Sequence, residues 1–314
     1  MNLHEHREEF DELITIVAEH IGIPSDAVRR DYYIVLMMQN LQNSAYAEAC
    51  VFKGGTSLSK CYPGSINRFS EDIDLTFIPV EDMNNKKYNK HLKKVEETIA
   101  AGFLIEKIEG ERNDRNKSAY VWPENESRNS CRVKLEIGSS VRPDPFTKRS
   151  MKTYIQEYLE ERGLNDVVAE YDLQPVSVNT LDITRTFLDK VMSVKRHAIC
   201  GTLPRKVRHI YDVTALFDRD DIQNFLSDTD RLKPLLVLTK ETDSYYLQKR
   251  NISEEYDPVG AYAFESWKQY FSNEIRSRYE TLHEDLLYTS ERQSFDKAVQ
   301  VFETISQIFA SIGE

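Results

Sequence analysis

FKGGTSL at residues 52–58 and RFSEDIDLTF at residues 68–77 are the two stretches on which the fold depends. In the second stretch apolar residues alternate with Asp72 and Asp74, as expected for a β-strand with one buried face. Side chains two positions apart in a strand point the same way, so the two carboxylates lie side by side. Like charges so placed repel unless a cation lies between them. The pattern therefore predicts a strand that holds Mg²⁺.

The first stretch has the residues of a phosphate-binding turn. Gly54 and Gly55 let a phosphate approach the backbone amides, and Thr56 and Ser57 add hydroxyl groups. The spacing is neither that of a P-loop nor that of a dinucleotide-binding fold. A phosphate turn close to a carboxylate pair predicts a site for a nucleotide and Mg²⁺.

A third carboxylate is expected on a neighbouring strand. Glu136 lies in RVKLEI at residues 132–137, where it shares one face with Lys134 and the apolar residues form the other face. It is therefore a candidate metal ligand and catalytic residue beside Asp72 and Asp74. The alternative is an exposed strand residue that only pairs with Lys134.

Two charged residues border the apolar stripes of predicted helices. Lys190 lies beside the stripe of a helix at about 182–199, and a lysine there can bind triphosphate as a point charge. Asp212 lies on the flank of a helix at 205–217, where it could orient Lys190, a base or a substrate hydroxyl. The alternative is a structural Lys–Asp pair between the two helices.

Length and periodicity predict two domains. For 314 residues two domains are the prior, and the boundary is expected near residue 178, between domains at 1–178 and 179–314. Helical patterns at 8–21 and 25–42 precede the glycine turn, and strand-like runs follow at 103–108, 118–122 and 131–137. A helix is expected at 151–161, Asn179 or Thr180 is expected to cap the helix that follows, and the rest of the chain reads as helical. The class is therefore α+β, with an antiparallel or mixed sheet.

Charge is unevenly distributed along the chain. The net charge of −11 argues against a general DNA-coating protein. Residues 185–209 nevertheless contain seven Lys or Arg and one acid, and the tail at 251–314 contains twelve acids and five bases. The basic segment is either a solvated face or a surface for triphosphate or RNA backbone. Five lysines on the predicted helix at 84–102 could likewise contact nucleic acid or form an ordinary wet face.

The sequence indicates a cytoplasmic protein without a membrane partner. The N-terminus lacks the apolar region of a signal peptide, and no stretch approaches the roughly 20 apolar residues of a membrane span. The four cysteines are far apart and form no CxxC pair, so reduced thiols are expected rather than a zinc or disulfide framework.

Taken together, the chain resembles the AbiEii/AbiGii-type toxins, bacterial nucleotidyltransferase-like proteins of toxin–antitoxin and abortive-infection (phage-defence) operons. Four stretches carry the resemblance, in the family order: residues 52–58, 68–75, 187–190 and 208–213. The resemblance implies a polymerase β-like nucleotidyltransferase core and a helical C-terminal domain. It also implies NTP and Mg²⁺, and a cognate antitoxin encoded in the same operon. Some members add nucleotides to tRNA 3′ ends and so block translation.

The resemblance assigns phosphate binding to Gly55, Thr56 and Ser57, metal binding to Asp72 and Asp74, and completion of the site to Lys190 and Asp212. The remaining site residues are expected from the residue patterns. The expected catalytic residues are Asp72, Asp74, Glu136, Lys190 and Asp212, with the first three as metal ligands. The expected nucleotide-binding residues are Gly54, Gly55, Thr56, Ser57, Arg68, Ser70 and Arg196. Two other readings stay open: an enzyme that nucleotidylates or phosphorylates a protein, and a regulatory module that binds NTP without turnover.

Overall fold

The computed structural model describes residues 1–79, 83–139, 142–247, 256–285, 287 and 292–313. The chain divides into two compact units. The first contains Met1–Cys61 and Phe69–Leu181, and the second contains Tyr62–Arg68 and Asp182–Glu314. The second unit therefore contains one short segment, Tyr62–Arg68, that comes from within the sequence of the first unit. No sequence feature had indicated that segment.

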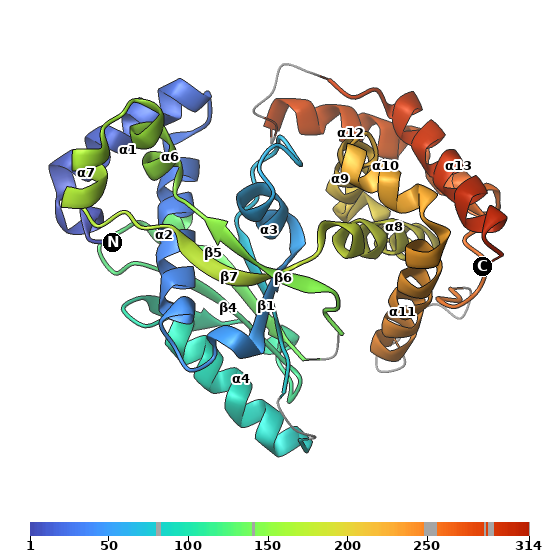
Figure 1. Ribbon diagram of the computed structural model, residues 1–314, viewed down its shortest axis with the longest axis horizontal. Helices are drawn as coiled ribbons and strands as arrows, with labels where there is room; N and C mark the ends of the chain where they lie inside the picture. The colour runs from blue at the N-terminus through green and yellow to red at the C-terminus, as the bar shows by residue number, and fades with distance from the viewer. Residues whose placement is uncertain (80–82, 140–141, 248–255, 286, 288–291, 314) are drawn as a thin grey trace. The chain divides into compact units, whose positions relative to one another are not determined.

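A seven-stranded mixed sheet is the core of the first unit (Figure 1). Its order is β3-β4-β5-β2-β1-β7-β6. The strands are β1 (Cys50–Lys53), β2 (Asp72–Phe77), β3 (Leu104–Lys107), β4 (Asn116–Trp122), β5 (Val133–Gly138), β6 (Phe146–Met151) and β7 (Val176–Leu181). β2 runs parallel to β5 and β1 runs parallel to β7, whereas the other neighbours are antiparallel.

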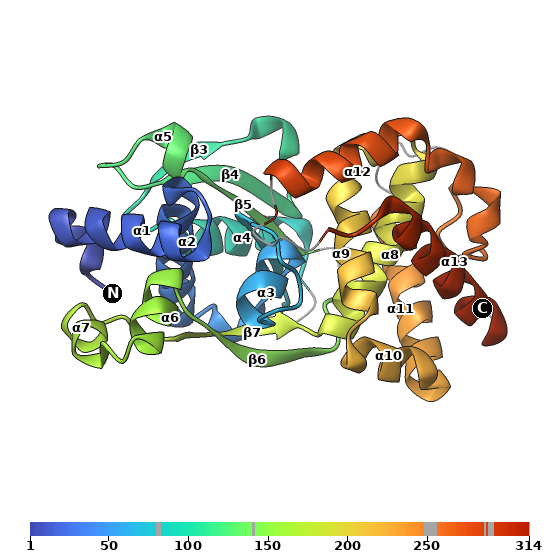
Figure 2. The same ribbon diagram turned by 90° about the horizontal axis from the view of Figure 1, so that it is seen from above.

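The first unit also contains helices, some packed on the strands and others on neighbouring helices. They are α1 (Arg7–Ile21), α2 (Ser25–Gln42), α3 (Gly54–Cys61), α4 (Asn85–Ile99), α5 (Arg128–Cys131), α6 (Tyr154–Glu161) and α7 (Asn165–Glu170). α2 contacts β7, α4 contacts β4 and β5, and the two helices contact each other, so they cover one face. Figure 2 shows α1 and α6 beside α2. α3 contacts β1 and β2, and this contact positions the glycine motif.

The second unit is helical in its described part. Its helices are α8 (Ile183–Ile199), α9 (Val207–Phe217), α10 (Asp220–Ser227), α11 (Thr229–Leu247), α12 (Asn273–Asp285) and α13 (Phe295–Ser311). α9 packs against α8, α12 and α13, so helices surround it. Residues 251–255, 286, 288–291 and 314 of the acidic tail lie outside the described residues. Among the helices that the structure describes, none is long and apolar enough to cross a membrane.

Short 3₁₀ turns join these elements: η1 (Leu3–Glu5), η2 (Ala47–Ala49), η3 (Glu109–Glu111), η4 (Leu203–Arg205), η5 (Phe264–Ser266) and η6 (Lys268–Tyr270). Polar side chains fix several helix starts. The side chain of Asn84 accepts a hydrogen bond from the N–H of Lys87, and that of Asp182 accepts one from the N–H of Thr184. Such caps satisfy N–H groups that the first turn of a helix leaves unpaired.

The α+β class, the mixed sheet with flanking helices and the helical C-terminal part are confirmed. The strand-like runs at 103–108, 118–122 and 131–137 correspond to β3, β4 and β5. Two local predictions were wrong. Met151 ends β6, and the helix begins only at Tyr154. Asn179 and Thr180 lie inside β7 and do not cap a helix, and Asp182 is the cap of α8.

Candidate active site

The carboxylates of the expected metal site lie on one face of β2 and β5. These strands are parallel, and their register places Asp74 opposite Glu136 and Asp72 opposite Lys134. Ile73 is fully buried on the core side of β2, so the two aspartates point to the other face. The strand predicted for the carboxylate pair is thus confirmed, and a third carboxylate stands directly opposite Asp74.

Lys134 links Glu136 to a second acid. Its Nζ lies 2.7 Å from Glu136 Oε1 and 2.8 Å from Glu111 Oε2. Burial alone would lower the pKa of Lys134, but the two glutamates outweigh it and the pKa is raised. Glu136 therefore shows the lysine pair that the sequence left open, while its side chain stays 37% exposed. The pair and a catalytic role are compatible, because the partly exposed side chain of Glu136 can still reach a substrate.

The glycine motif forms the first turn of α3 rather than a separate loop. Gly54 has φ +85°, and a Cβ atom there would lie 2.3 Å from Asp74 Oδ2. Both observations require glycine, because other residues rarely adopt this φ and a side chain would displace the carboxylate. Asp74 thus lies against the N-terminal turn of α3, where free N–H groups favour negative charge.

The hydroxyl groups of the motif are used inside the first unit. Ser57 Oγ donates to the carbonyl of Gly54 at 2.9 Å, and Thr56 Oγ1 donates to Ser70 Oγ at 3.0 Å. Thr56 and Ser57 are both buried. These bonds brace the turn and tie it to the segment before β2. The groups left to contact a phosphate are the backbone amides of Gly54 and Gly55, so direct phosphate contact by the hydroxyls stays a prediction.

Asp72 and Asp74 fit Mg²⁺ by the chemistry of their donors. In nucleotide sites Mg²⁺ is held by one or two carboxylates, and substrate phosphates and water complete the octahedron. Both aspartates are partly exposed, which leaves room for a substrate. In the described ranges no three His, Cys, Asp or Glu side chains are placed to hold a metal together. The role of Glu136 as a third ligand therefore remains a prediction.

In the second unit, Asp212 on α9 binds two cations at once. Arg68 donates to it through Nε at 2.6 Å and Nη2 at 2.7 Å, and Lys190 on α8 donates from Nζ at 2.6 Å. Asp212 is 0% exposed and Lys190 is 6% exposed. The expectation that Asp212 lies on a helix flank was wrong, because helices α8, α12 and α13 surround α9. The structure brings Lys190 and Asp212 together and adds Arg68.

The cluster carries a surplus of positive charge. Burial alone would raise the pKa of Asp212, but Arg68 and Lys190 hold it well below its usual range. The pKa of Lys190 is lowered, first by burial and then by Arg68. His209 Nδ1 forms a hydrogen bond with Ser193 Oγ at 3.1 Å. The pKa of His209 is lowered well below 6.5, mainly because the ring is buried and secondly because Lys190 is close. One carboxylate shared by two cations explains these directions.

Much of the basic segment at 185–209 is internal. Arg185 pairs with Asp189 at 2.9 Å, Lys195 donates to the carbonyl of Ala261 at 2.6 Å, and Arg196 pairs with Asp243. The nucleotide-binding role expected for Arg196 stays a prediction, and its guanidinium is engaged by a carboxylate of its own unit. Part of the charge surplus seen in the sequence is therefore used for packing rather than for a surface.

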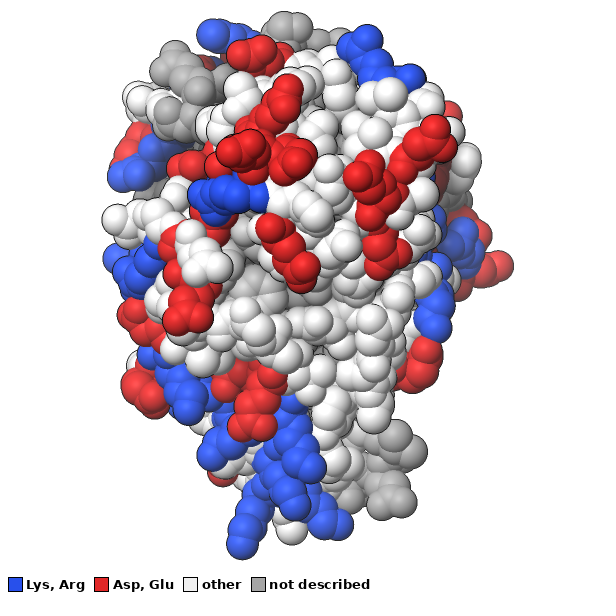
Figure 3. All heavy atoms as spheres, turned by 90° about the vertical axis from the view of Figure 1, so that its left-hand side faces the viewer, with Lys and Arg blue, Asp and Glu red and all other residues white. Residues whose placement is uncertain are grey.

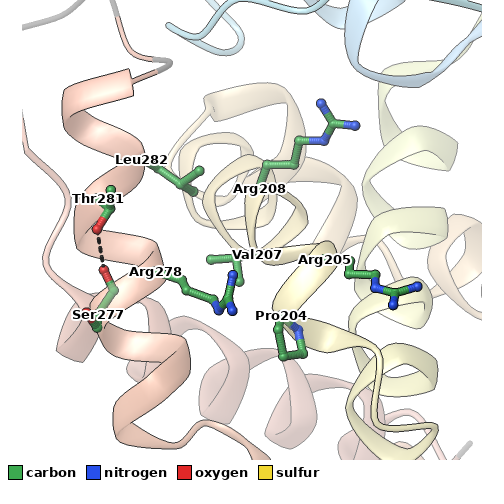
Figure 4. A pocket seen from close by; sticks show the side chains of 8 residues that line it. All are labelled: Pro204, Arg205, Val207, Arg208, Ser277, Arg278, Thr281 and Leu282. Atoms are coloured by element: carbon green, nitrogen blue, oxygen red, sulfur yellow. Dashed lines mark hydrogen bonds between the residues drawn. The ribbon is translucent and has the colours of Figure 1, made fainter.

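Arginines also line a pocket of about 380 Å³ in the second unit (Figure 4). Arg205 and Arg208 come from the end of the basic segment, and Arg278 comes from α12. Ser277 and Thr281 add small polar side chains to the wall. Arg278 is also held by Glu274 at 3.0 Å. At this pocket, arginines of the basic segment reach the surface instead of being used for packing.

Sequence reasoning missed a buried ion pair under the glycine motif. Lys60 on α3 lies 2.7 Å from Asp31 on α2, and each side chain is 3% exposed. Asp31 also accepts the N–H of Tyr154 at 2.7 Å, and the Tyr154 ring centroid lies 3.9 Å from Lys60 Nζ. The only sequence signal was a charged residue inside an apolar helix pattern at each position, which is too common to be informative.

Comparisons with known proteins identify the family. The family model described as "Nucleotidyl transferase AbiEii toxin, Type IV TA system" matches residues 35–301. Among solved structures, the nucleotidyltransferase toxin MenT4 from Mycobacterium tuberculosis H37Rv is similar, with 17% sequence identity and a TM-score of 0.49, over 96% of this chain and 99% of that chain. No curated protein matches the sequence. The chain belongs to the AbiEii family of nucleotidyltransferase toxins of type IV toxin–antitoxin systems.

Proposed function

We propose that this protein transfers nucleotides from an NTP to the 3′ ends of tRNA, with Mg²⁺, and so blocks translation. Family membership supports nucleotidyl transfer. The observation that carries the proposal is the meeting of three elements in the first unit. Asp74 lies against the glycine turn of α3 and opposite Glu136. An antitoxin encoded in the same operon and a role in phage defence belong to the same proposal.

Each group of the first unit has one task in this reaction. Asp72 and Asp74 hold the metal, and the amides of Gly54 and Gly55 bind phosphate oxygens. Mg²⁺, when bound, would neutralise phosphate charge and align the reacting oxygens. The acceptor 3′-hydroxyl oxygen bonds to the α-phosphorus, the bond from that phosphorus to the bridging oxygen breaks, and pyrophosphate leaves. Glu136 accepts the hydroxyl proton.

For the second unit, the proposal gives Lys190 the role of a cation for the triphosphate. Asp212 is then a positioning residue, because its carboxylate fixes the lysine ammonium through a 2.6 Å hydrogen bond. Arg68 acts through Asp212, to which it donates twice. A surplus of positive charge in this cluster suits an anionic substrate.

The first test is transfer of labelled nucleotides by wild-type protein and by Asp72→Asn. The variant keeps the size of the side chain but loses the charge that holds a cation. We expect transfer to fall about a hundredfold or more, with an unchanged unfolding transition. Glu71→Gln is the matched control, because Glu71 is the neighbouring carboxylate and pairs with Arg30. Full activity of Asp72→Asn would refute the proposed site.

The acceptor is identified in the same assay. Labelled NTPs are incubated with total RNA and with total protein from cells, and the fraction that takes up label is measured. Label in tRNA supports the proposal. Label in protein favours the protein-modifying reading, and tight NTP binding without label in either fraction favours a regulatory module. Lys190→Ala is expected to abolish transfer, and its folding must be checked because the side chain is buried.

A further inference from the structure

Five lysines share one side of α4, and all five are exposed: Lys86, Lys87, Lys90, Lys93 and Lys94. At about 3.6 residues per turn they cover roughly a third of the helix circumference. The other side, with Leu92, Val95 and Ile99, is buried. Figure 3 shows basic side chains gathered at the bottom of the view, which is where α4 lies in Figure 1. We call these five residues the lysine face of α4.

These lysines lack acidic partners within the described residues, where none of their side chains forms an ion pair or a hydrogen bond. Other surface lysines do pair. Lys148 binds Glu48, Lys268 binds Glu303 and Lys297 binds Asp218. Like charges three or four positions apart on a helix repel each other. Glu97 is also exposed on this side of α4, so the face holds five lysines against one acid. This excess of positive charge on a protein of net charge −11 indicates a surface for an anionic partner.

We propose that the lysine face of α4 binds the phosphate backbone of the RNA acceptor. Protein–protein interfaces are depleted in lysine and are anchored by aromatic or arginine side chains. The aromatic residue of α4, Tyr88, is only 8% exposed and packs inward on Phe77. Phosphate contacts, in contrast, are made mainly by Lys and Arg and need no apolar anchor.

The lysine face lies at the end of β2 away from the carboxylates. Phe77 at that end stacks on His91 of α4, with ring centroids 5.7 Å apart. From Asp72 to Phe77 the strand advances about 17 Å at ~3.3 Å per residue. Stacked nucleotides advance ~3.4 Å each. The lysines lie on the outer side of α4, and α4 covers the sheet face opposite to the carboxylates, so, if the proposed function holds, an RNA whose 3′ end reaches Asp72 meets α4 more than about five nucleotides upstream.

The decisive measurement is RNA binding as a function of salt, without NTP. The triple variant Lys86→Gln, Lys90→Gln, Lys93→Gln is compared with Lys148→Gln, Lys268→Gln, Lys297→Gln, which removes the same charge elsewhere. The probe is deacylated tRNA. We expect the α4 variant to bind about tenfold to a hundredfold more weakly, with a salt slope lower by about 2–3. The control keeps the wild-type affinity and slope. Equal behaviour of the two variants, or wild-type binding that is insensitive to salt, overturns the proposal.

Two further measurements, transfer kinetics and polyglutamate binding, distinguish this proposal from the alternatives. Transfer to a trinucleotide should be unchanged in the α4 variant, whereas KM for tRNA should rise and kcat should stay the same. If wild-type protein transfers nucleotides to no RNA, the proposed function fails, and the salt-dependent binding still decides the role of α4. Polyglutamate serves as an acidic polypeptide probe. Loss of polyglutamate binding with unchanged tRNA binding would show a protein-binding surface and overturn the RNA assignment.

Discussion

At Gly54 a backbone requirement and a side-chain requirement coincide. The φ of +85° excludes most other residues, and Asp74 occupies the space of a Cβ atom. This position therefore couples the shape of the α3 turn to the place of a proposed metal ligand. The coupling was not visible in the sequence, where two consecutive glycines are compatible with any tight turn.

Gly54→Ala should reduce both stability and nucleotide transfer. Gly102→Ala is the matched control, because Gly102 has the same φ of +85° and has nothing within 4 Å of its Cβ position. The control should lose about 1–2 kcal/mol from backbone strain alone. Gly54→Ala should lose more, and transfer should fall because Asp74 is displaced. Denaturant unfolding and the transfer assay measure the two effects, and equal losses in both variants would show that contact with Asp74 has no consequence.

His197 gives the second unit a dependence on pH. Its Nδ1 lies 2.7 Å from Thr202 Oγ1, and burial, Arg196 and Lys206 lower its pKa to about 4. Between pH 4 and 6.5 the folded protein holds this histidine neutral, whereas the unfolded chain binds a proton. The free energy of unfolding therefore decreases as pH falls through this window.

Replacing His197 by Gln should flatten the acid side of the stability profile. The shift in pKa corresponds to at most about 3 kcal/mol between pH 6.5 and 4. His6→Gln is the control, because His6 is exposed. The measurement is the denaturant midpoint at several pH values. An unchanged profile in His197→Gln would mean that the histidine is not the proton acceptor on unfolding.

At the scale of secondary-structure elements, a buried ion pair connects α3 to α2. Lys60 on α3 and Asp31 on α2 form the pair, and both are buried. A buried charge that loses its partner costs much more than the pair contributes. The helix that carries the glycine motif is therefore anchored to α2 through one lysine.

Lys60→Met should destabilise the protein by about 3–5 kcal/mol, because it takes the cation away from the buried Asp31. Asp31→Asn should have a smaller effect, because Glu157 Oε1 still lies 4.0 Å from Lys60 Nζ. The double variant should be less destabilised than the sum of the two. Lys148→Met and Glu48→Gln form a control cycle at an exposed pair and should show a coupling below about 1 kcal/mol. Urea unfolding of all six variants gives both couplings, and additivity at Lys60 and Asp31 would argue against the anchor.

Elements with a regular apolar pattern were predictable, and β6 and β7, which lack one, were not. β5 alternates buried and half-exposed residues, and its pattern identified it in advance. β6 is exposed at four consecutive positions, so it has no alternation to detect. β7 buries Asn179 and Thr180, and these polar residues suggested a helix cap. The same limit applies to Asp212, because periodicity shows one buried face but not that other helices cover the remaining faces.

For the whole molecule, the segment 62–68 makes the second unit discontinuous in sequence. This segment supplies Arg68 to Asp212, and the N–H of Asn67 donates to the Tyr211 hydroxyl at 3.3 Å. A cut before residue 182 therefore removes part of the second unit. A fragment that begins at the expected boundary near residue 178 therefore contains the whole second unit only if the segment 62–68 is added to it.

A fragment of residues 182–314 should lack a cooperative unfolding transition. Without Arg68, the buried Asp212 retains only one of its two cations. Adding a peptide of residues 60–70 should restore the transition, whereas the same peptide with Arg68→Gln should not. Circular dichroism during thermal denaturation measures both. A fragment that unfolds cooperatively on its own would show that the segment 62–68 is dispensable for this unit.

The discontinuity also imposes an order on biosynthesis. Asp212 follows Arg68 by 144 residues. At roughly 5–20 residues per second, a ribosome needs about 7 to 30 s to add them. During that interval the nascent chain carries Arg68 but not yet Asp212. The cluster of Arg68, Lys190 and Asp212 is therefore completed late in translation, and a polypeptide released early from the ribosome could not assemble it.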